Sequence, residues 1–236
     1  MFENRRGRLP VALKECPAPP IAESPLECSS IIPFGCLQEG DIIVLRGRKL
    51  TSRIVGLWSR GASHVGQLMK LDGELWFVDS VSWLSDKSVV QYAGDGGKGC
   101  GLRSGVIGRA LPPLLRSYTH SAVYRPVPGL TDKELDIMRD EFKRLHGSAY
   151  EKRAARLLNS IPALPQTPPE THFYCSQLTA HFFRKINRLR RDFSHRRFRS
   201  GAYLPSQIVR AIDTRYMGCL PTTVPLPLLV PKAGAN

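Results

Sequence analysis

The pattern of apolar and polar residues between positions 63 and 81 predicts a β-hairpin. Residues 63–70 and residues 74–81 both favour extended strands. Asp72-Gly73 stands between the two runs, and this dipeptide is typical of a tight hairpin turn because both positions of that turn need positive φ. The sequence therefore predicts two antiparallel strands joined by a two-residue turn.

The register of this hairpin places a histidine and an aspartate on one face. A two-residue turn pairs Leu71 with Glu74. The same register pairs Gly66 with Asp79. Because successive side chains alternate between faces, His64 and Asp79 then share a face, with Gly66 leaving room between them. A slip of one residue would move Asp79 to the other face.

A helix is predicted over residues 131–147. Thr131 and Glu134 form a capping-box pattern at its start, and Gly147 is typical of a helix end. Apolar residues at helical spacing form its buried stripe, which consists of Leu135, Met138, Phe142 and Leu145. We expect this helix to have a structural role.

A second helix is predicted from about residue 174 to residue 189, and it begins at a cysteine. Its apolar stripe consists of Leu178, Phe182, Ile186 and Leu189. Cys175 lies on the same stripe in the first turn, since Pro168 and Pro169 prevent an earlier start. The N-terminus of a helix stabilises a thiolate, and its free backbone N–H groups can stabilise an oxyanion.

His64 and Cys175 have the chemistry of a cysteine-nucleophile site. A thiol needs a base to become a thiolate near neutral pH, and an imidazole is the side chain best suited to that task. Asp79 would hold the imidazole in the correct tautomer and stabilise its protonated form. The competing interpretation is that Cys175 is a small buried hydrophobe, which is common for free cysteines. His172, close in sequence to Cys175, is the alternative base.

The cysteines and histidines show no pattern of metal ligands. The six cysteines are Cys16, Cys28, Cys36, Cys100, Cys175 and Cys219. They contain no C-x-x-C pair, which argues against a structural zinc site. Because the first residues lack the apolar stretch of a signal peptide, we expect free thiols in a reducing compartment, not a disulfide framework. We expect neither a metal nor another cofactor.

Composition divides the chain into a central domain and two extended ends. A chain of 236 residues can bury one sizeable core, which we assign to residues 37–215. Residues 1–36 are rich in Pro and Arg and predict an extended arm, and residues 216–236 predict an extended Pro-rich tail. No apolar run approaches the roughly 20 residues of a spanning helix. We therefore expect a protein that stays inside the cell or is packaged in a virion.

The formal net charge of +14 is concentrated beyond the cysteine-containing helix. The cluster consists of Arg184, Lys185, Arg188, Arg190, Arg191, Arg196, Arg197 and Arg199. Such a run is either a solvated face or an electrostatic footprint for a polyanion, such as nucleic acid, an acidic protein surface or anionic lipid headgroups. No nucleic-acid-binding motif accompanies it, so sequence-specific recognition is not expected.

Six short motifs occur in an order that resembles one superfamily. In chain order they are Gly40-Asp41-Ile42-Ile43-Val44, Ser63-His64-Val65-Gly66, Phe77-Val78-Asp79-Ser80, Gly147-Ser148-Ala149-Tyr150, Phe173-Tyr174-Cys175-Ser176-Gln177-Leu178 and Leu204-Pro205-Ser206-Gln207. They resemble the circularly permuted branch of the NlpC-type, papain-like cysteine peptidases. That branch includes YiiX/YaeF-like bacterial proteins, a poxvirus group and, more distantly, lecithin-retinol acyltransferase-like enzymes. As the permuted branch requires, the histidine precedes the cysteine.

The resemblance implies an α+β fold in a permuted papain-like arrangement, with helices packed on a curved antiparallel sheet. It assigns Cys175 as nucleophile, His64 as base and Asp79 as the orienting residue, and it places Tyr174 and Ser176 beside the oxyanion site. The chain departs from the pattern in two ways. Gln177 replaces an acidic residue that is frequent in this branch, and the third polar position, often glutamate, is the shorter Asp79.

Two functional hypotheses follow. The first is a thiol hydrolase that cleaves amide or ester bonds in peptides, peptidoglycan or lipids through a thioester acyl-enzyme, or an acyltransferase that uses the same residues. The second is a structural or interaction protein, for instance a component of a virion or another assembly, with the fold as a scaffold. Pro-rich arms and a basic face favour the second hypothesis, whereas the intact set of Cys175, His64 and Asp79 favours the first.

Overall fold

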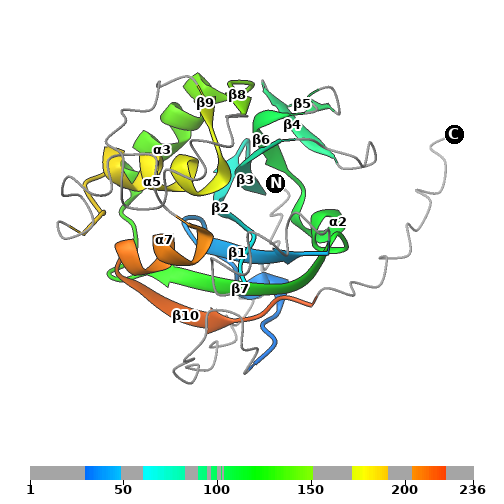
Figure 1. Ribbon diagram of the computed structural model, residues 1–236. Helices are drawn as coiled ribbons and strands as arrows, with labels where there is room; N and C mark the ends of the chain where they lie inside the picture. The colour runs from blue at the N-terminus through cyan, green and yellow to red at the C-terminus, as the bar shows by residue number, and fades with distance from the viewer. Residues whose placement is uncertain are drawn as a thin grey trace, which may run out of the picture.

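The computed structural model describes residues 30–48, 61–82, 90–94, 97–99, 102, 104–150, 172–190 and 204–221. An eight-stranded antiparallel sheet dominates these residues (Figure 1). Its strands, in spatial order, are β10 (Thr214–Gly218), β7 (Tyr118–Pro126), β1 (Ile42–Gly47), β2 (His64–Leu71), β3 (Glu74–Val81), β6 (Gly105–Arg109), β4 (Gln91–Gly94) and β5 (Gly97–Gly99). The prediction of an α+β fold with a large antiparallel sheet is confirmed.

The remaining elements cover this sheet. They are the short η1 (Phe34–Cys36), α2 (Leu111–Leu115), α3 (Asp132–Leu145), α5 (Cys175–Lys185), α7 (Pro205–Ala211) and the parallel pair β8 (Ala149–Tyr150) and β9 (His172–Phe173). None of the helices in these described parts of the chain has the length and apolar character needed to cross a membrane.

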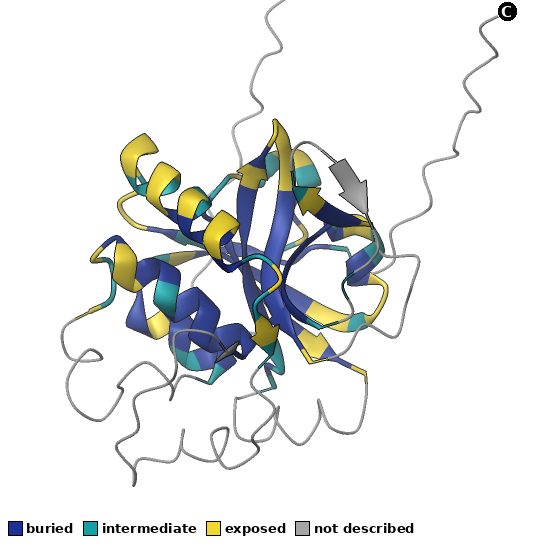
Figure 2. Ribbon diagram, turned by 90° about the horizontal axis from the view of Figure 1, so that it is seen from above, coloured by how far each residue is buried: buried dark blue, intermediate teal, exposed yellow. Residues whose placement is uncertain are grey.

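Both faces of the central strands are buried. Helices α3, α5 and α7 pack on one face, and α2 packs with the terminal segments on the other. Ile42 and Val44 of β1 join the apolar cluster that contains residues of α3, α5 and α7. The alternate residues Ile43 and Leu45 join the cluster that contains α2. Successive side chains of β1 therefore point into two different cores, which explains why residues 42–45 are all apolar. Figure 2 shows the buried strands and the exposed outer turns of the helices.

The predicted hairpin is confirmed as β2 and β3. Leu71 pairs with Glu74, and Gln67 pairs with Val78 in the same register. Asp72 and Gly73 form the turn with φ values of 49° and 83°, which is the positive-φ conformation that the dipeptide favours. The local sequence was therefore sufficient to set this register.

Both predicted helices exist, but one ends earlier than predicted. Helix α3 has the full capping box of Thr131 and Glu134. Helix α5 begins at Cys175 as predicted and ends at Lys185, four residues before the predicted end. Asn187 adopts a φ of 57°, which stops the helix, and Leu189 beyond it forms a β-bridge with Ile212.

The sheet continues past the domain boundary expected at residue 215, since β10 extends to Gly218. The chain after β10 pairs with the segment before η1: the Ile32 amide donates to the Cys219 carbonyl at 2.9 Å, and the Cys219 amide donates to the Ser30 carbonyl at 2.8 Å. Residues 30–36 and 216–221 thus belong to the packed structure, while the rest of the two predicted extensions lies outside the described residues.

The expectation that every thiol is free is wrong for Cys36, which is disulfide-bonded. Cys175 and Cys219 are free and buried. The other three cysteines lie outside the described residues. The sequence contained no paired-cysteine spacing that would have indicated this bond.

A buried polar cluster ties α3 to α5. Glu141 of α3 accepts hydrogen bonds from Arg144 at 3.0 and 2.6 Å, and it lies 2.5 Å from Nε2 of His181 on α5. The hydrogen bonds from Arg144 lower the pKa of Glu141 to about 2, against the opposing effect of burial and with a further contribution from His181. The ionised carboxylate therefore joins the two helices.

We predict that this cluster makes stability sensitive to acid. Because the pKa of Glu141 is lowered from 4.5 to about 2, its contribution is present above pH 4.5 and is lost as the pH falls towards 2. Glu141→Gln should lower the free energy of unfolding at neutral pH, and the difference from the unaltered chain should shrink below pH 4.5. Urea unfolding at a series of pH values measures this. Asp140→Asn, at an exposed neighbouring position, is the control, and an equal pH-dependent loss in both variants would contradict the prediction.

Candidate functional site

The hairpin brings His64 and Asp79 into direct contact. The β2–β3 register places both side chains on one face, and Nε2 of His64 forms a hydrogen bond and ion pair with Oδ2 of Asp79. The Asp79 side chain is fully buried, and that of His64 is 14% exposed. The contact occupies one ring nitrogen of His64 and leaves Nδ1 for a second partner.

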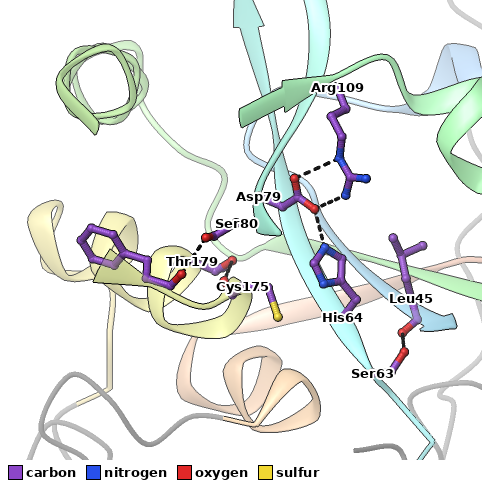
Figure 3. A network of polar contacts seen from close by, with 9 residues as sticks. Leu45, Ser63, His64, Asp79, Ser80, Arg109, Cys175 and Thr179 are labelled. Atoms are coloured by element: carbon purple, nitrogen blue, oxygen red, sulfur yellow. Dashed lines mark hydrogen bonds and ion pairs between the residues drawn. The ribbon is translucent and has the colours of Figure 1, made fainter. Parts of the chain in front are cut away.

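Arg109, at the end of β6, binds the same carboxylate. Its Nε donates to Oδ1 of Asp79 at 3.1 Å, and its Nη2 donates to Oδ2. Strand pairing explains the meeting, because Arg109 pairs with Phe77 and Ile107 pairs with Asp79, which puts Arg109 diagonally across from Asp79 on one face. The carboxylate therefore lies between an imidazole and a guanidinium, as Figure 3 shows.

Two aromatic rings enclose this group. The ring of Tyr118, at the start of β7, stacks on the imidazole of His64 with centroids 6.0 Å apart and planes 21° apart. Tyr118 also interacts with Arg109 and raises the pKa of its guanidinium. The ring of Phe77 lies 6.3 Å from His64 and 5.8 Å from the guanidinium carbon of Arg109. Tyr118 thus contacts both cationic groups of the site.

Cys175 reaches the site from α5. It is the first residue of that helix and is 8% exposed. Figure 3 shows it beside His64, on the side of the ring that carries Nδ1. Within the described residues no hydrogen bond joins the sulfur to the ring, and Cys175 is one of the groups that raise the pKa of the imidazole.

The first turn of α5 is fixed by Gln177. Its Oε1 accepts a hydrogen bond from the backbone amide of Tyr174 at 3.1 Å. The first amide to bond within the helix is that of Leu178, which donates to the Tyr174 carbonyl at 3.1 Å. Gln177, which departs from the acidic residue of the resembled family, therefore serves as the N3 residue of a helix cap.

One further hydrogen bond joins the segment before α5 to the sheet, and another forms within the first turn of α5. The hydroxyl of Ser80 on β3, next to Asp79, donates to the Phe173 carbonyl at 2.6 Å. The hydroxyl of Thr179 donates to the Cys175 carbonyl at 3.3 Å. The same strand that carries Asp79 therefore also anchors the residue before the helix cap.

Electrostatics favour a protonated His64. Burial alone lowers the pKa of this imidazole, but Tyr118, Cys175 and Asp79 together, with the hydrogen bond to Asp79, raise the pKa well above its ordinary value. The pKa of Arg109 is also raised, because Asp79 and Tyr118 outweigh the effect of burial. An imidazolium next to a thiol is the arrangement that stabilises a thiolate.

The other predicted site residues have different outcomes. Tyr174 and Ser176 are buried in the first turn of α5, and their part in an oxyanion site stays a prediction. His172 lies in β9, and its side chain is outside the described structure.

The predicted polyanion-binding cluster is partly engaged in ion pairs. Arg188 donates to Glu134 at 2.5 Å, Lys185 lies 3.7 Å from Glu141, and Arg190 lies 3.8 Å from Asp213. Arg184 is exposed, and Arg191, Arg196 and Arg197 are outside the described residues. Polyanion binding by this cluster therefore stays a prediction.

Arg109 and Tyr118 were not identified from the sequence. Both come from strands that have no local turn joining them to the hairpin, so no short-range register placed them beside Asp79. The available signal was a single arginine at the end of the apolar run 106–108. A charge within a buried strand requires a partner, and this would have directed attention to Asp79.

Gly66 makes room for the ring of Phe77. A Cβ atom at this position would lie 2.5 Å from Cζ of Phe77 and 2.6 Å from the carbonyl oxygen of Val78. The missing side chain therefore lets the Phe77 ring pack beneath the site.

Comparison with known proteins shows similarity in fold. No family model and no curated protein matches the sequence. The structure is similar to the crystal structure of YiiX from Escherichia coli O157:H7, with a TM-score of 0.50 and 14% sequence identity over 76% of this chain and 95% of that chain. The chain therefore shares a YiiX-like α+β fold at low sequence identity.

YiiX is described as a metalloprotein. Among the described residues of this chain, no group of three or more His, Cys, Asp or Glu side chains is placed to hold a metal ion. Both oxygens of Asp79 bind Arg109, whose positive charge would repel a metal cation. The described residues do not fit a metal at this position.

We predict that Gly66→Ala disturbs the site through Phe77. The added methyl group must displace a buried ring or a strand carbonyl, and we expect a loss of about 1–3 kcal/mol in the free energy of unfolding. Urea unfolding measures the loss. Gly129→Ala is the control, because nothing lies within 4 Å of a Cβ atom there. Equal stability of the two variants would contradict the assigned role of Gly66.

We also predict that His64 titrates well above 6.5 and that Cys175→Ala lowers its pKa. The reason is that Cys175 is one of the groups that favour the protonated ring. Because the pKa is raised on folding, the stabilisation is complete below pH 6.5 and is lost as the pH rises through the pKa of the folded protein. Histidine NMR titration measures this. Cys219→Ala, at the other free buried cysteine, should leave His64 unchanged.

Proposed function

We propose that this protein is a thiol hydrolase in which Cys175 is the nucleophile, His64 transfers the proton and Asp79 orients His64. The observation that carries the proposal is the position of the imidazole. Its Nε2 is held by Asp79, and its other nitrogen lies on the side of Cys175 at the start of α5 (Figure 3). This is the relation between base, orienting residue and nucleophile that acyl transfer needs.

The reaction follows from the charges of the site. The Cys175 thiolate attacks the carbonyl carbon, a C–S bond forms, and the carbonyl electron pair moves to oxygen. Backbone N–H groups in the first turn of α5, where Cys175 begins the helix, would stabilise the oxyanion. The His64 imidazolium then gives its proton to the departing nitrogen or oxygen, and a thioester remains.

Release of the product uses the same residues in reverse. Neutral His64 removes a proton from water, the resulting hydroxide attacks the thioester carbon, and the C–S bond breaks to return the thiolate. The His64 imidazolium is restored beside it. An alcohol or amine acceptor in place of water would make the protein an acyltransferase with the same residues.

The substrate class follows from the resemblance to the permuted NlpC-type, papain-like enzymes. We propose an amide or ester bond in a peptide, peptidoglycan or lipid. The YiiX-like fold and the order of His64 before Cys175 both support the permuted arrangement. An inert scaffold would have no need for an imidazole held between a buried carboxylate and a thiol.

We predict that a small electrophile such as iodoacetamide labels Cys175 much faster than Cys219, the other free buried thiol. His64→Ala should slow the labelling of Cys175 about a hundredfold, because the thiolate loses its cationic partner. Peptide mass spectrometry over a time course measures each rate. A screen of peptide, peptidoglycan and lipid ester substrates, with Cys175→Ala as the inactive reference, would then identify the bond that is cleaved.

His120→Ala is the control for this experiment, since His120 is an exposed histidine on β7. It should leave both labelling rates unchanged. If Cys175 is labelled at the same rate as Cys219 and His64→Ala has no effect, the proposed hydrolase function is contradicted. That result would favour the structural role.

A further inference from the structure

We propose that Arg109 is a positioning residue of this site, which acts on the reaction through Asp79 and Tyr118. The inference rests on the proposed thiol chemistry of Cys175 and His64. Arg109 itself has a side chain that is only 4% exposed, so it acts through its neighbours and not by contact with substrate.

The first function of Arg109 is to make a buried carboxylate possible. Asp79 is fully buried, and a charged carboxylate in such a place needs cationic partners. Arg109 binds both of its oxygens, whereas His64 binds only Oδ2. The two-point contact fixes the plane of the carboxylate, which in turn fixes the direction from which it binds the imidazole.

The second function concerns the face of the imidazole. The Tyr118 ring stacks on His64, and Tyr118 also interacts with Arg109. One guanidinium therefore acts on both neighbours of His64, the carboxylate at its edge and the aromatic ring on its face. Together they leave the ring one orientation, with Nδ1 towards Cys175.

The charges of the four groups balance in pairs. Arg109 neutralises Asp79, which leaves the His64 imidazolium to neutralise the Cys175 thiolate. Without Arg109, the buried carboxylate would have His64 as its remaining cationic partner. The proton would then move from His64 to Asp79, since transfer removes two buried charges, and Cys175 would lose its counter-ion.

The chain contains a matched control for this arginine. Arg125 on β7 binds both oxygens of the buried Asp41, with Nε to Oδ1 at 2.8 Å and Nη2 to Oδ2 at 2.9 Å. Arg125 lies next to the last residue of β7, whereas Tyr118 is the first residue of that strand. Arg125→Met therefore breaks an equivalent buried pair at the opposite end of the strand.

The test compares Arg109→Met, Arg109→Lys and Arg125→Met in the full chain. We expect Arg109→Met to slow iodoacetamide labelling of Cys175 by about tenfold to a hundredfold across the pH profile. In the same variant, the ¹⁵N signals of His64 should change from those of an imidazolium to those of a neutral ring near neutral pH. Arg109→Lys should restore part of both signals, and Arg125→Met should change neither while lowering stability.

Either of two results would overturn the inference. One is a folded Arg109→Met protein with unchanged labelling and an unchanged His64 imidazolium. The other is an equal loss in Arg125→Met, which would reduce Arg109 to a general contributor to stability. If Arg109→Met does not fold, the labelling rates of Arg109→Lys and Tyr118→Phe test the inference instead. Unchanged labelling in both would overturn the inference, and a several-fold loss in both would support it.

A second measurement separates this inference from the proposed function. In a Cys175→Ala background, the His64 signals report on Arg109 whether or not the thiol is a nucleophile. Failure of the proposed function would appear as labelling of Cys175 that does not depend on His64. Failure of the role of Arg109 would appear as His64-dependent labelling that is unchanged in the Arg109 variants.

Discussion

The carboxylate of Asp79 is the group on which the arrangement of the site depends. A fully buried charge is costly, and this one is stabilised only because three adjacent strands each supply a part of the contact. Strand β3 carries the carboxylate, β2 carries His64 and β6 carries Arg109. The register of two strand pairs must therefore be correct before the imidazole is oriented, so the precision of the site comes from rigid sheet geometry and not from loops.

Cys175 is positioned by a second set of contacts. Ser80 joins β3 to Phe173, two residues before α5, and Glu141 joins α3 to α5, so the helix is held from two directions. Its first turn needs no acidic side chain, since the amide of Gln177 caps it. The sheet positions His64, and α5 positions the thiol of Cys175. The hydroxyl of Ser80, next to Asp79, connects the sheet to the segment that leads into α5.

Local signals in the sequence were sufficient to predict the positions of His64, Asp79 and Cys175, but not those of Arg109 and Tyr118. Asp72-Gly73 and a two-residue periodicity predicted the β2–β3 register, and helical spacing after two prolines placed Cys175 at a helix start. Arg109 and Tyr118 depend on strand pairings between distant segments, which no turn chemistry specifies. The end of α5 was missed because Asn187 adopts a left-handed conformation that apolar periodicity does not reveal. Sequence therefore predicted the contacts that form within a hairpin or a helix, and not those between them.

The segment before η1 pairs with the segment after β10, and this pairing would allow the chain to be circularly permuted. Ile31 and Cys219 form a parallel bridge, so two parts of the chain that are far apart in sequence lie together on the same side of the fold. A short linker between these segments, with new ends opened between β8 and β9, would yield a chain in which Cys175 comes before His64. Every contact of the site would be retained, because each is made among residues of β2, β3, β6, β7, β9 or α5. The order of Cys175 and His64 along the chain is thus a property of connectivity, and their relation in space is a property of the three-dimensional arrangement alone.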